Sequence, residues 1–226
     1  MLDLAFPKVC HLCLGTCNSL LCDACEDSLT ENSGCRCQQC DLPLKTESIL
    51  CAACLKKTPS FSVLHSAWVY THPLDQLIHH FKDKQAHFWG RYLGEKLISR
   101  IYREYKQDKP DLVIAVPIHW SKQLVRGFNQ SQILAQLCAK TLNLPISTAI
   151  RKTSRTADQK NLSRHQRIFN LKKSFKVTRN VEGLHIALVD DVVTTGATVE
   201  TLSRLLLNAG AARVDVWALA RTPRTE

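Results

Sequence analysis

Long apolar runs are missing from this sequence, and none approaches the ~20 residues that a helix needs to cross a bilayer. Before the first cysteine there is one basic residue, Lys8, and no apolar stretch typical of a secretory signal peptide. These absences predict a cytoplasmic protein without a transmembrane segment. The composition is otherwise that of a globular protein, with 45% apolar and 22% charged residues, and 226 residues are enough for one medium domain and a small one.

Cysteine is almost absent after residue 54: ten of the eleven cysteines lie before that point and only Cys138 follows. A cytosolic protein keeps its thiols reduced, so these ten do not indicate a disulfide framework. Eight of them form four Cys-x-x-Cys pairs, and two such pairs complete a closed tetrahedral site of four thiolates. The sequence therefore predicts two structural zinc ions, although a cross-braced exchange of pairs also fits the spacing. The expected ligand sets are Cys10, Cys13, Cys22 and Cys25 for one ion, and Cys37, Cys40, Cys51 and Cys54 for the other.

Apolar periodicity is weak up to residue 58 and clear from residue 61 on. We therefore expect a double zinc ribbon over 1–58 and an α/β domain over 61–226, whose strand–helix–strand units favour a mostly parallel sheet flanked by helices. The expected strands are Ser62–Tyr70, Leu112–Val116, His185–Val189 and Val214–Ala220; the expected helices are 74–81, 86–105, Gly127–Leu142 and Val199–Asn208; and 151–170 is expected to be a loop with a short helix.

Acidic residues are nearly missing from 151–179, which holds ten Lys/Arg and a single acid, Asp158. This segment supplies +9 of the chain's formal charge of +10, and such a surface suits a polyanionic partner. Two alternatives remain open: a basic face exposed to solvent, and a loop that closes over a pyrophosphate group. The candidate contacts to single-stranded nucleic acid are Arg151, Lys152, Arg155, Lys172 and Lys173.

The loop Leu188–Thr198 lacks the lysine of a Walker loop and the three glycines of a dinucleotide fingerprint. It joins an expected strand to a helix N-terminus, where Gly196 and small hydroxyl residues let backbone N–H groups converge on a phosphate. Two adjacent carboxylates suit the cis-diol of a sugar. The sequence therefore predicts a cradle for ribose 5-phosphate, formed by Asp190, Asp191, Val192, Val193, Thr194, Thr195, Gly196, Ala197 and Thr198.

This loop resembles the binding motif for 5-phosphoribosyl-1-diphosphate (PRPP) in type I phosphoribosyltransferases. Further motifs precede it in order: Cys37-Gln-Gln-Cys-Asp-Leu-Pro-Leu44; Pro73-Leu, Leu77-Ile-His79 and Lys82; Val116-Pro and Arg126-Gly-Phe-Asn-Gln130; and Gln159, Leu162, Arg167 and Asn170. Together they resemble the ComF/GntX family, a double zinc ribbon fused to a phosphoribosyltransferase-like domain. Asp41 stands where that family usually has glycine, and Phe81-Lys82-Asp83 replaces its usual Leu-Lys-Phe.

The resemblance implies that Asp190 and Asp191 bind the ribose hydroxyls, that the Thr-Thr loop holds the 5-phosphate, and that Mg²⁺ accompanies the pyrophosphate. It also implies a pyrophosphate loop and a flexible loop, for which the candidate residues are Pro117, His119, Arg126, Gln159, Arg164 and Arg167. The implied role is to handle imported single-stranded DNA in the cytoplasm during natural transformation, with DNA-uptake machinery at the inner membrane as a partner.

Three functions fit these observations. The first is a DNA-handling factor that binds PRPP or a related sugar phosphate. The second is an active, Mg²⁺-dependent phosphoribosyltransferase that acts on a nucleobase or a nucleic acid, although no segment identifies a nucleobase pocket. The third is a non-catalytic zinc-ribbon adaptor, which the intact acidic pair and Thr-Thr-Gly-Ala-Thr disfavour. The sequence therefore favours the first.

Overall fold

A five-stranded parallel sheet forms the centre of the molecule. The computed structural model describes residues 9–31, 34–82, 86–118, 124, 127–152 and 174–224. The sheet order is β1-β7-β6-β2-β3, and every neighbouring pair is parallel. Its interior strands are rich in Val, Ile, Leu and Ala and are buried on both faces, as parallel sheets require. The strands are β1 (Leu64–Val69), β2 (Leu112–Ala115), β3 (Ile146–Ser147), β6 (His185–Val193) and β7 (Arg213–Arg221).

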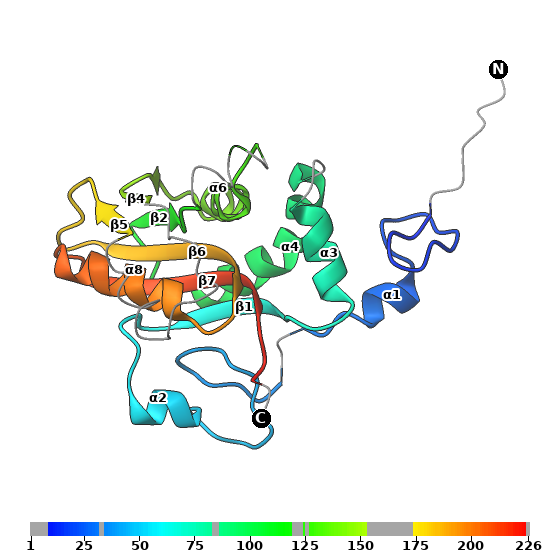
Figure 1. Ribbon diagram of the computed structural model, residues 1–226, viewed down its shortest axis with the longest axis horizontal. Coiled ribbons are helices and arrows are strands. Elements are labelled where there is room, and N and C mark those ends of the chain that lie inside the picture. Colours follow the sequence, from blue (N-terminus) through cyan, green and yellow to red (C-terminus); the bar gives the residue numbers. More distant parts are fainter. Residues whose placement is uncertain are drawn as a thin grey trace, which may run out of the picture.

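Helices cover both faces of this sheet (Figure 1). Three of them, α3 (Leu74–Phe81), α4 (Ala86–Glu104) and α6 (Gln130–Leu142), share an apolar core with one face. The other face packs against α8 (Ala197–Asn208). The inward positions expected from the 3.6-residue period of α3 and α4 are all at most 1% exposed: Leu74, Leu77, Ile78, Phe81, Trp89, Leu93, Leu97 and Ile101. The expected α/β class with a mostly parallel, helix-flanked sheet is confirmed.

Some element boundaries differ from the expectation. The helix expected from Gly127 begins at Gln130, because Gly127 has a positive φ of 80° and the Asn129 side chain accepts a hydrogen bond from the Ser131 N–H at 3.1 Å. The strand expected to end at Val189 continues to Val193. Residues 151–152 belong to a short antiparallel hairpin, β4 (Ile150–Lys152) with β5 (Phe175–Val177), where only loop and helix were expected. Residues 153–173 lie outside the described part of the chain.

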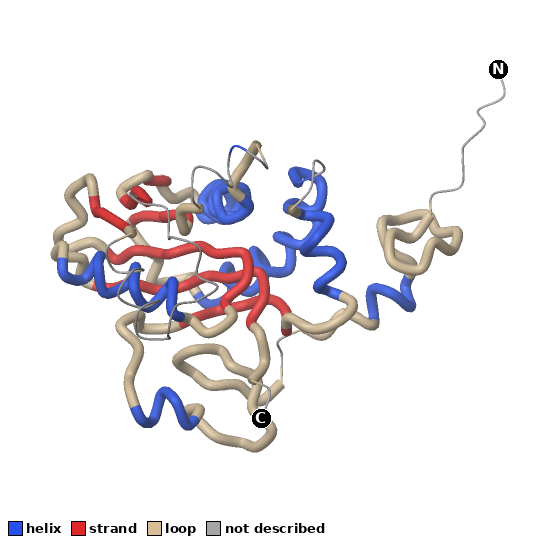
Figure 2. Tube along the Cα trace, in the orientation of Figure 1, coloured by secondary structure: helices blue, strands red, loops and turns tan. Residues whose placement is uncertain are grey.

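The cysteine-rich region consists mainly of loops with two short helices, α1 (Asp23–Asp27) and α2 (Ala52–Lys56), as Figure 2 shows. The first cysteine module, which contains Cys10 to Cys25, lies beyond α3 (Figure 1). The second, which contains Cys37 to Cys54, lies beneath β1 and α8 in the same view. Segments next to both modules cover the outer edge of β1: the N–H of Leu64 donates to the Gln39 carbonyl and that of Val69 to the Thr30 carbonyl, both at 2.9 Å. These bonds protect an edge strand from pairing with other chains.

Asp41 joins the second cysteine module to the sheet and to α4. Its φ of 54° explains why glycine suits this position, but its carboxylate is 2% exposed and fully engaged. The carboxylate accepts from the N–H of Ser66 at 2.6 Å and from Arg100 Nη2 at 2.8 Å, and it lies 3.3 Å from Arg36 Nε. The departure from glycine therefore does more than alter a turn, because it adds a buried contact between two parts of the chain.

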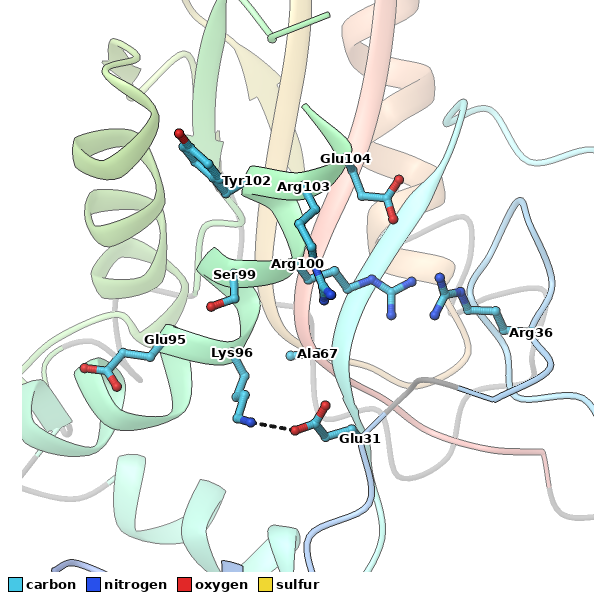
Figure 3. Close-up of a pocket in the computed structure, with 10 residues that line it drawn as sticks. All are labelled: Glu31, Arg36, Ala67, Glu95, Lys96, Ser99, Arg100, Tyr102, Arg103 and Glu104. Atoms are coloured by element: carbon cyan, nitrogen blue, oxygen red, sulfur yellow. Dashed lines mark hydrogen bonds and ion pairs between the residues drawn. The ribbon is translucent and has the colours of Figure 1, made fainter. Parts of the chain in front are cut away.

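A cavity of about 980 Å³ lies beside this contact. Figure 3 shows the guanidinium groups of Arg36 and Arg100 pointing toward one another, and Lys96 reaching Glu31. The Lys96 Nζ lies 2.7 Å from Glu31 Oε1. Acidic and basic side chains are mixed along its wall, and no residue of Leu188–Thr198 lines it. Among the described residues, no helix is long and apolar enough to cross a membrane.

Candidate functional site

The order of the strands creates a crevice at the carboxyl ends of β2 and β6. The chain leaves β2 through α6 toward β3 on one side, and leaves β6 through α8 toward β7 on the other. Ligands of open α/β sheets bind where two neighbouring strands diverge in this way. The segment after Ala115 and the loop after β6 meet at this point, since Ala115 pairs with Val189. The fold therefore brings the loop Leu188–Thr198 to the expected binding edge.

The phosphate loop, Thr194–Thr198, forms the turn from β6 into α8. Gly196 is the N-cap of the helix with φ 79° and ψ 0°, a left-handed conformation that glycine adopts without strain. Thr194, Thr195 and Ala197 are exposed, and a small hollow of about 30 Å³ is lined by Asp190 and residues 192–199. A helix N-terminus with exposed backbone N–H groups favours an anion. This arrangement suits a single phosphate group.

Two half-buried carboxylates lie beside the phosphate loop. Asp190 Oδ1 accepts from Ser131 Oγ at 3.1 Å and from the Asp191 N–H at 2.9 Å. Burial and the neighbouring Asp191 charge raise the pKa of Asp190 to about 8, although these two hydrogen bonds oppose the shift. Burial and the Asp191 charge both disfavour the charged form of Asp190 as long as no cation or ligand hydroxyl is bound beside it. A ligand that brings a cation or hydroxyl donors to this pair favours its ionised form.

Three residues that received no role in the sequence analysis support this acidic pair. Ser131 holds Asp190, and Asn129 holds the end of β2 by donating from Nδ2 to the Val116 carbonyl at 3.0 Å. Lys82, which follows α3, places its Nζ 3.6 Å from Asp191 Oδ2. Asn129 and Lys82 both occur in the family motifs quoted above, so those motifs could have indicated that the two residues belong to the site. Ser131 follows directly after one of them.

The remaining loop candidates are only partly described. Pro117 is half-buried at the end of β2 and lines a cavity of about 370 Å³ together with Phe128, Asn129 and Ile150. This cavity adjoins the start of α6 and the start of β4. The other pyrophosphate and flexible-loop candidates, His119, Arg126, Gln159, Arg164 and Arg167, lie outside the described residues.

Two of the five nucleic-acid candidates lie on the β4–β5 hairpin. Arg151 is exposed and pairs with Lys176 across the hairpin, and the Lys152 Nζ lies 5.4 Å from the centre of the Phe175 ring. Arg179 is exposed just after β5. The hairpin therefore presents exposed basic groups, whereas the Phe175 ring is 6% exposed and belongs to the core. Arg155, Lys172 and Lys173 lie outside the described part of the chain.

The eight expected cysteine ligands form two clusters with the sequential pairing. Within each set of four, the Sγ atoms lie within 4.8 Å of one another, so the structure does not adopt the cross-braced exchange. The first cluster is partly exposed and the second is buried. Burial opposes ionisation of Cys10, but backbone N–H groups of Cys13 and Cys22 outweigh it and lower the Cys10 pKa to about 6. Four converging thiolates are the donor set of a tetrahedral metal site, so both clusters can hold a metal ion.

Comparison with known proteins gives similarity over nearly all of the chain. Residues 92–226 match the family described as the phosphoribosyl transferase domain. The chain is 37% identical over 226 residues to DNA utilization protein YhgH of Salmonella typhimurium, covering 97% of this chain and 99% of that protein. It is 32% identical to Competence protein F of Haemophilus influenzae, covering 89% and 90%. A purine phosphoribosyltransferase structure from Pyrococcus horikoshii is 18% identical over 57% of this chain and 74% of that one, with a TM-score of 0.40.

Proposed function

Because the chain belongs to the ComF family, with a cysteine-rich N-terminal module and a phosphoribosyl transferase domain, we propose that it binds PRPP with Mg²⁺ and handles single-stranded DNA. The names of its relatives, a DNA utilization protein and a competence protein, support a role in the uptake or use of DNA. In this proposal the protein acts in the cytoplasm, in contact with DNA-uptake machinery at the inner membrane. The observation that carries the ligand assignment is the acidic pair beside the phosphate loop.

In this proposal, two groups of residues bind different parts of the sugar phosphate. The backbone N–H groups of Thr194–Thr198 receive the 5-phosphate at the N-terminus of α8. Asp190 and Asp191 accept hydrogen bonds from the ribose hydroxyls, while Ser131 and Lys82 hold the two carboxylates in place. Mg²⁺ would neutralise the pyrophosphate, and a cation near the acidic pair would favour the ionised form of Asp190. The preceding segment at Pro117 faces the same crevice and is the proposed pyrophosphate side.

Zinc is the proposed occupant of both cysteine clusters. Tetrahedral zinc sites of four thiolates have no open position for a substrate, which assigns them a structural role. Their position supports this, since residues next to the clusters cover the outer edge of β1 and include Asp41. The two ions therefore stabilise the modules that complete the sheet.

The basic hairpin is the proposed contact with single-stranded DNA. Arg151 and Lys176 are both exposed and supply charge for phosphates. Ile150, the first residue of β4, also lines the cavity next to Pro117. DNA bound along the hairpin would therefore approach the sugar-phosphate site.

A second candidate function is transfer of phosphoribose from PRPP to a nucleobase or to nucleic acid. The 370 Å³ cavity beside Pro117 favours it, because it adjoins the crevice and has room for an acceptor group. Pyrophosphate release from PRPP and Mg²⁺, tested against a panel of nucleobases and single-stranded DNA, separates the two. A DNA-handling factor that only binds PRPP releases none with any acceptor, whereas a transferase releases it with one.

Calorimetry of PRPP binding in the presence of Mg²⁺ tests the ligand assignment. The Asp190→Asn/Asp191→Asn variant loses charge-assisted hydrogen bonds worth ~1.5–3 kcal/mol each, so its affinity falls by roughly tenfold or more per residue. The exposed Glu95→Gln on α4 is the matched control and binds as the wild type does. Unchanged PRPP affinity in the double variant would rule out this site.

A further inference from the structure

The second cysteine cluster and the phosphate loop are joined by one buried arginine. Arg221, the last residue of β7, is 6% exposed. Its Nε donates to the carbonyl of Cys40 at 3.1 Å, and its Nη1 donates to the carbonyl of Val193 at 2.9 Å and to that of Thr194. Cys40 belongs to the second cluster. Val193 is the last residue of β6, and Thr194 is the first residue of the phosphate loop. The guanidinium group of Arg221 therefore contacts the second cluster through Cys40 and the phosphate loop through Thr194.

A second connection runs from the segment just after this module to the first turn of α8. Ser60, six residues after Cys54, donates from its backbone N–H and its hydroxyl to the carboxylate of Glu200, at 2.7 and 3.0 Å. The Glu200 N–H in turn donates to the carbonyl of Gly196 at 2.9 Å. The turn that holds the proposed phosphate-binding groups is thus held at both ends, by Arg221 beside Cys40 and by Ser60 just after the module.

Direct packing between the module and the loop is interrupted by a cavity. A space of about 490 Å³ is lined on one side by Cys40, Cys51 and Cys54, and on the other by Thr195, Gly196 and Ala197. Arg221 also lines this space. Where a cavity separates two groups, their relative position depends on the hydrogen bonds that cross beside it. Arg221 and the Ser60–Glu200 contact are such bonds.

The position of the Cys40 carbonyl depends on what holds its thiol. In a Cys-x-x-Cys turn the bound ion fixes the Sγ atoms and, through one short side chain, the backbone of the ligand residue. Loss of the ion would release the Cys40 thiol and let the Cys40 carbonyl, between Gln39 and Asp41, reorient. This would weaken its hydrogen bond from buried Arg221 and loosen the hold of Arg221 on the Val193 and Thr194 carbonyls. The first cluster packs in the other core, with α4, and does not share this connection.

We propose that Arg221 is a positioning residue that couples the second cysteine cluster to the phosphate loop, so that metal occupancy of this cluster sets the loop's affinity for sugar phosphates. The coupling gives the cluster a regulatory role: agents that remove its metal, such as thiol oxidants or competing metal-binding proteins, weaken sugar-phosphate binding at a site beyond the cavity. The ligand class rests on the proposed function, but the mechanical link does not.

Arg221→Lys and its matched control Arg213→Lys test the positioning role in the metal-loaded full chain. At 221 the lysine ammonium keeps the charge, but its donors sit on one nitrogen and do not bridge the Cys40 and Thr194 carbonyls as Nε and Nη1 do. At 213, the opposite end of β7, an ammonium still pairs with Asp108 and Asp215. We expect Arg221→Lys to retain both metal ions and to bind PRPP with Mg²⁺ about tenfold more weakly. Arg213→Lys binds as the wild type does, and equal affinity in the two variants overturns the proposal.

Hydrogen exchange during chelation tests the coupling without any ligand. The amides to follow are Glu200, bonded to the Gly196 carbonyl, and Thr222, bonded to the Val193 carbonyl; Val116, bonded to Val189 within the sheet, is the control. Removing the second ion from the wild type should speed exchange at Glu200 and Thr222 about tenfold and leave Val116 protected. In Arg221→Lys both amides exchange faster before chelation and change little after it, as coupled sites do. Unchanged exchange in the chelated wild type contradicts the coupling, whereas a metal-loaded wild type that binds no PRPP contradicts only the proposed function.

Discussion

Asp41 illustrates how much one residue contributes beyond its place in a motif. Its neighbours in sequence predict a turn after Cys40, and its positive φ of 54° agrees with that turn. Its partners, Ser66 and Arg100, lie 25 and 59 residues away in the chain, so no local pattern announces them. Burial raises the pKa of the Asp41 carboxyl, while Arg100 and Ser66 oppose that shift. The ion pair between Asp41 and Arg100 is therefore a structural contact that becomes visible only in the folded chain.

Replacing Asp41 by alanine should destabilise the protein by about 3 kcal/mol, because Arg100 is then left in a buried site without its carboxylate. Urea unfolding of the metal-loaded protein measures the effect. The control is Glu95→Ala, whose exposed carboxylate lies 4.0 Å from Arg91 Nε on the surface of α4 and should cost less than about 0.5 kcal/mol. A loss below about 1 kcal/mol for Asp41→Ala would contradict this assignment.

Asp190 and Asp191 contrast with Asp41, because these two residues can be linked from the sequence alone. Asp190 and Asp191 are adjacent in sequence, so a shared role for them could be proposed from the loop alone. Ser131, which holds Asp190, lies 59 residues earlier and belongs to a different element. The signal for it was weak, because serine after a glycine-containing turn is ordinary at a helix start. Adjacent ligands can be predicted, but the residues that orient them require the fold.

At the scale of elements, apolar periodicity predicted the long helices and the buried strands well. The four inward residues of α3 and the four of α4 recur at helical spacing and are all buried. The β4–β5 hairpin was missed because its sequence, Ile150-Arg-Lys152, is polar and its partner strand lies more than 20 residues later. Two- and three-residue strands are defined by their pairing rather than by a pattern. The β4 and β5 strands are therefore recognisable from their cross-strand pairing and not from their sequences.

The hairpin makes a prediction about nucleic acid. Changing Arg151, Lys152 and Arg155 to glutamine should weaken binding of a single-stranded oligonucleotide, and should reduce the salt slope by about 0.7 for each phosphate that the variant no longer neutralises. PRPP affinity should not change, whereas changes at Arg164 and Arg167 should weaken both ligands. Fluorescence anisotropy across a salt series provides the measurement.

Lys56→Gln/Lys57→Gln/Lys106→Gln is the matched control for charge, because it also removes three basic groups, which are exposed and lie outside the hairpin. It should leave the affinity and the salt slope close to those of the wild type. If the hairpin variant keeps both quantities unchanged, the basic hairpin is not the nucleic-acid site.

At the scale of the whole molecule, the cysteine spacing predicted two clusters and the structure places each set of four thiols together. The spacing left two pairings open, and the sequential one is adopted. The strand order β1-β7-β6-β2-β3 was beyond the sequence, although the parallel direction was expected from the crossover rule. That order places the β2 and β6 ends side by side and so creates the crevice.

The purified protein should contain two zinc ions per chain, because each cluster has four thiolates and structural zinc supplies much of the folding free energy of small modules. Cys37→Ser should unfold the second module and lower solubility. Elemental analysis of undamaged protein measures the content. One ion or none would show that at least one cluster is not a zinc site.

The central claim is that the turn from β6 into α8 holds the phosphate of a phosphoribosyl ligand. A crystal structure of the zinc-loaded chain with PRPP and Mg²⁺ tests it most directly. We expect the 5-phosphate oxygens to lie ~3 Å from backbone nitrogens of Thr194–Thr198, with the ribose hydroxyls bonded to Asp190 and Asp191. Electron density for PRPP at the basic hairpin or in the cavity between Arg36 and Arg100, with the phosphate loop vacant, would contradict the claim.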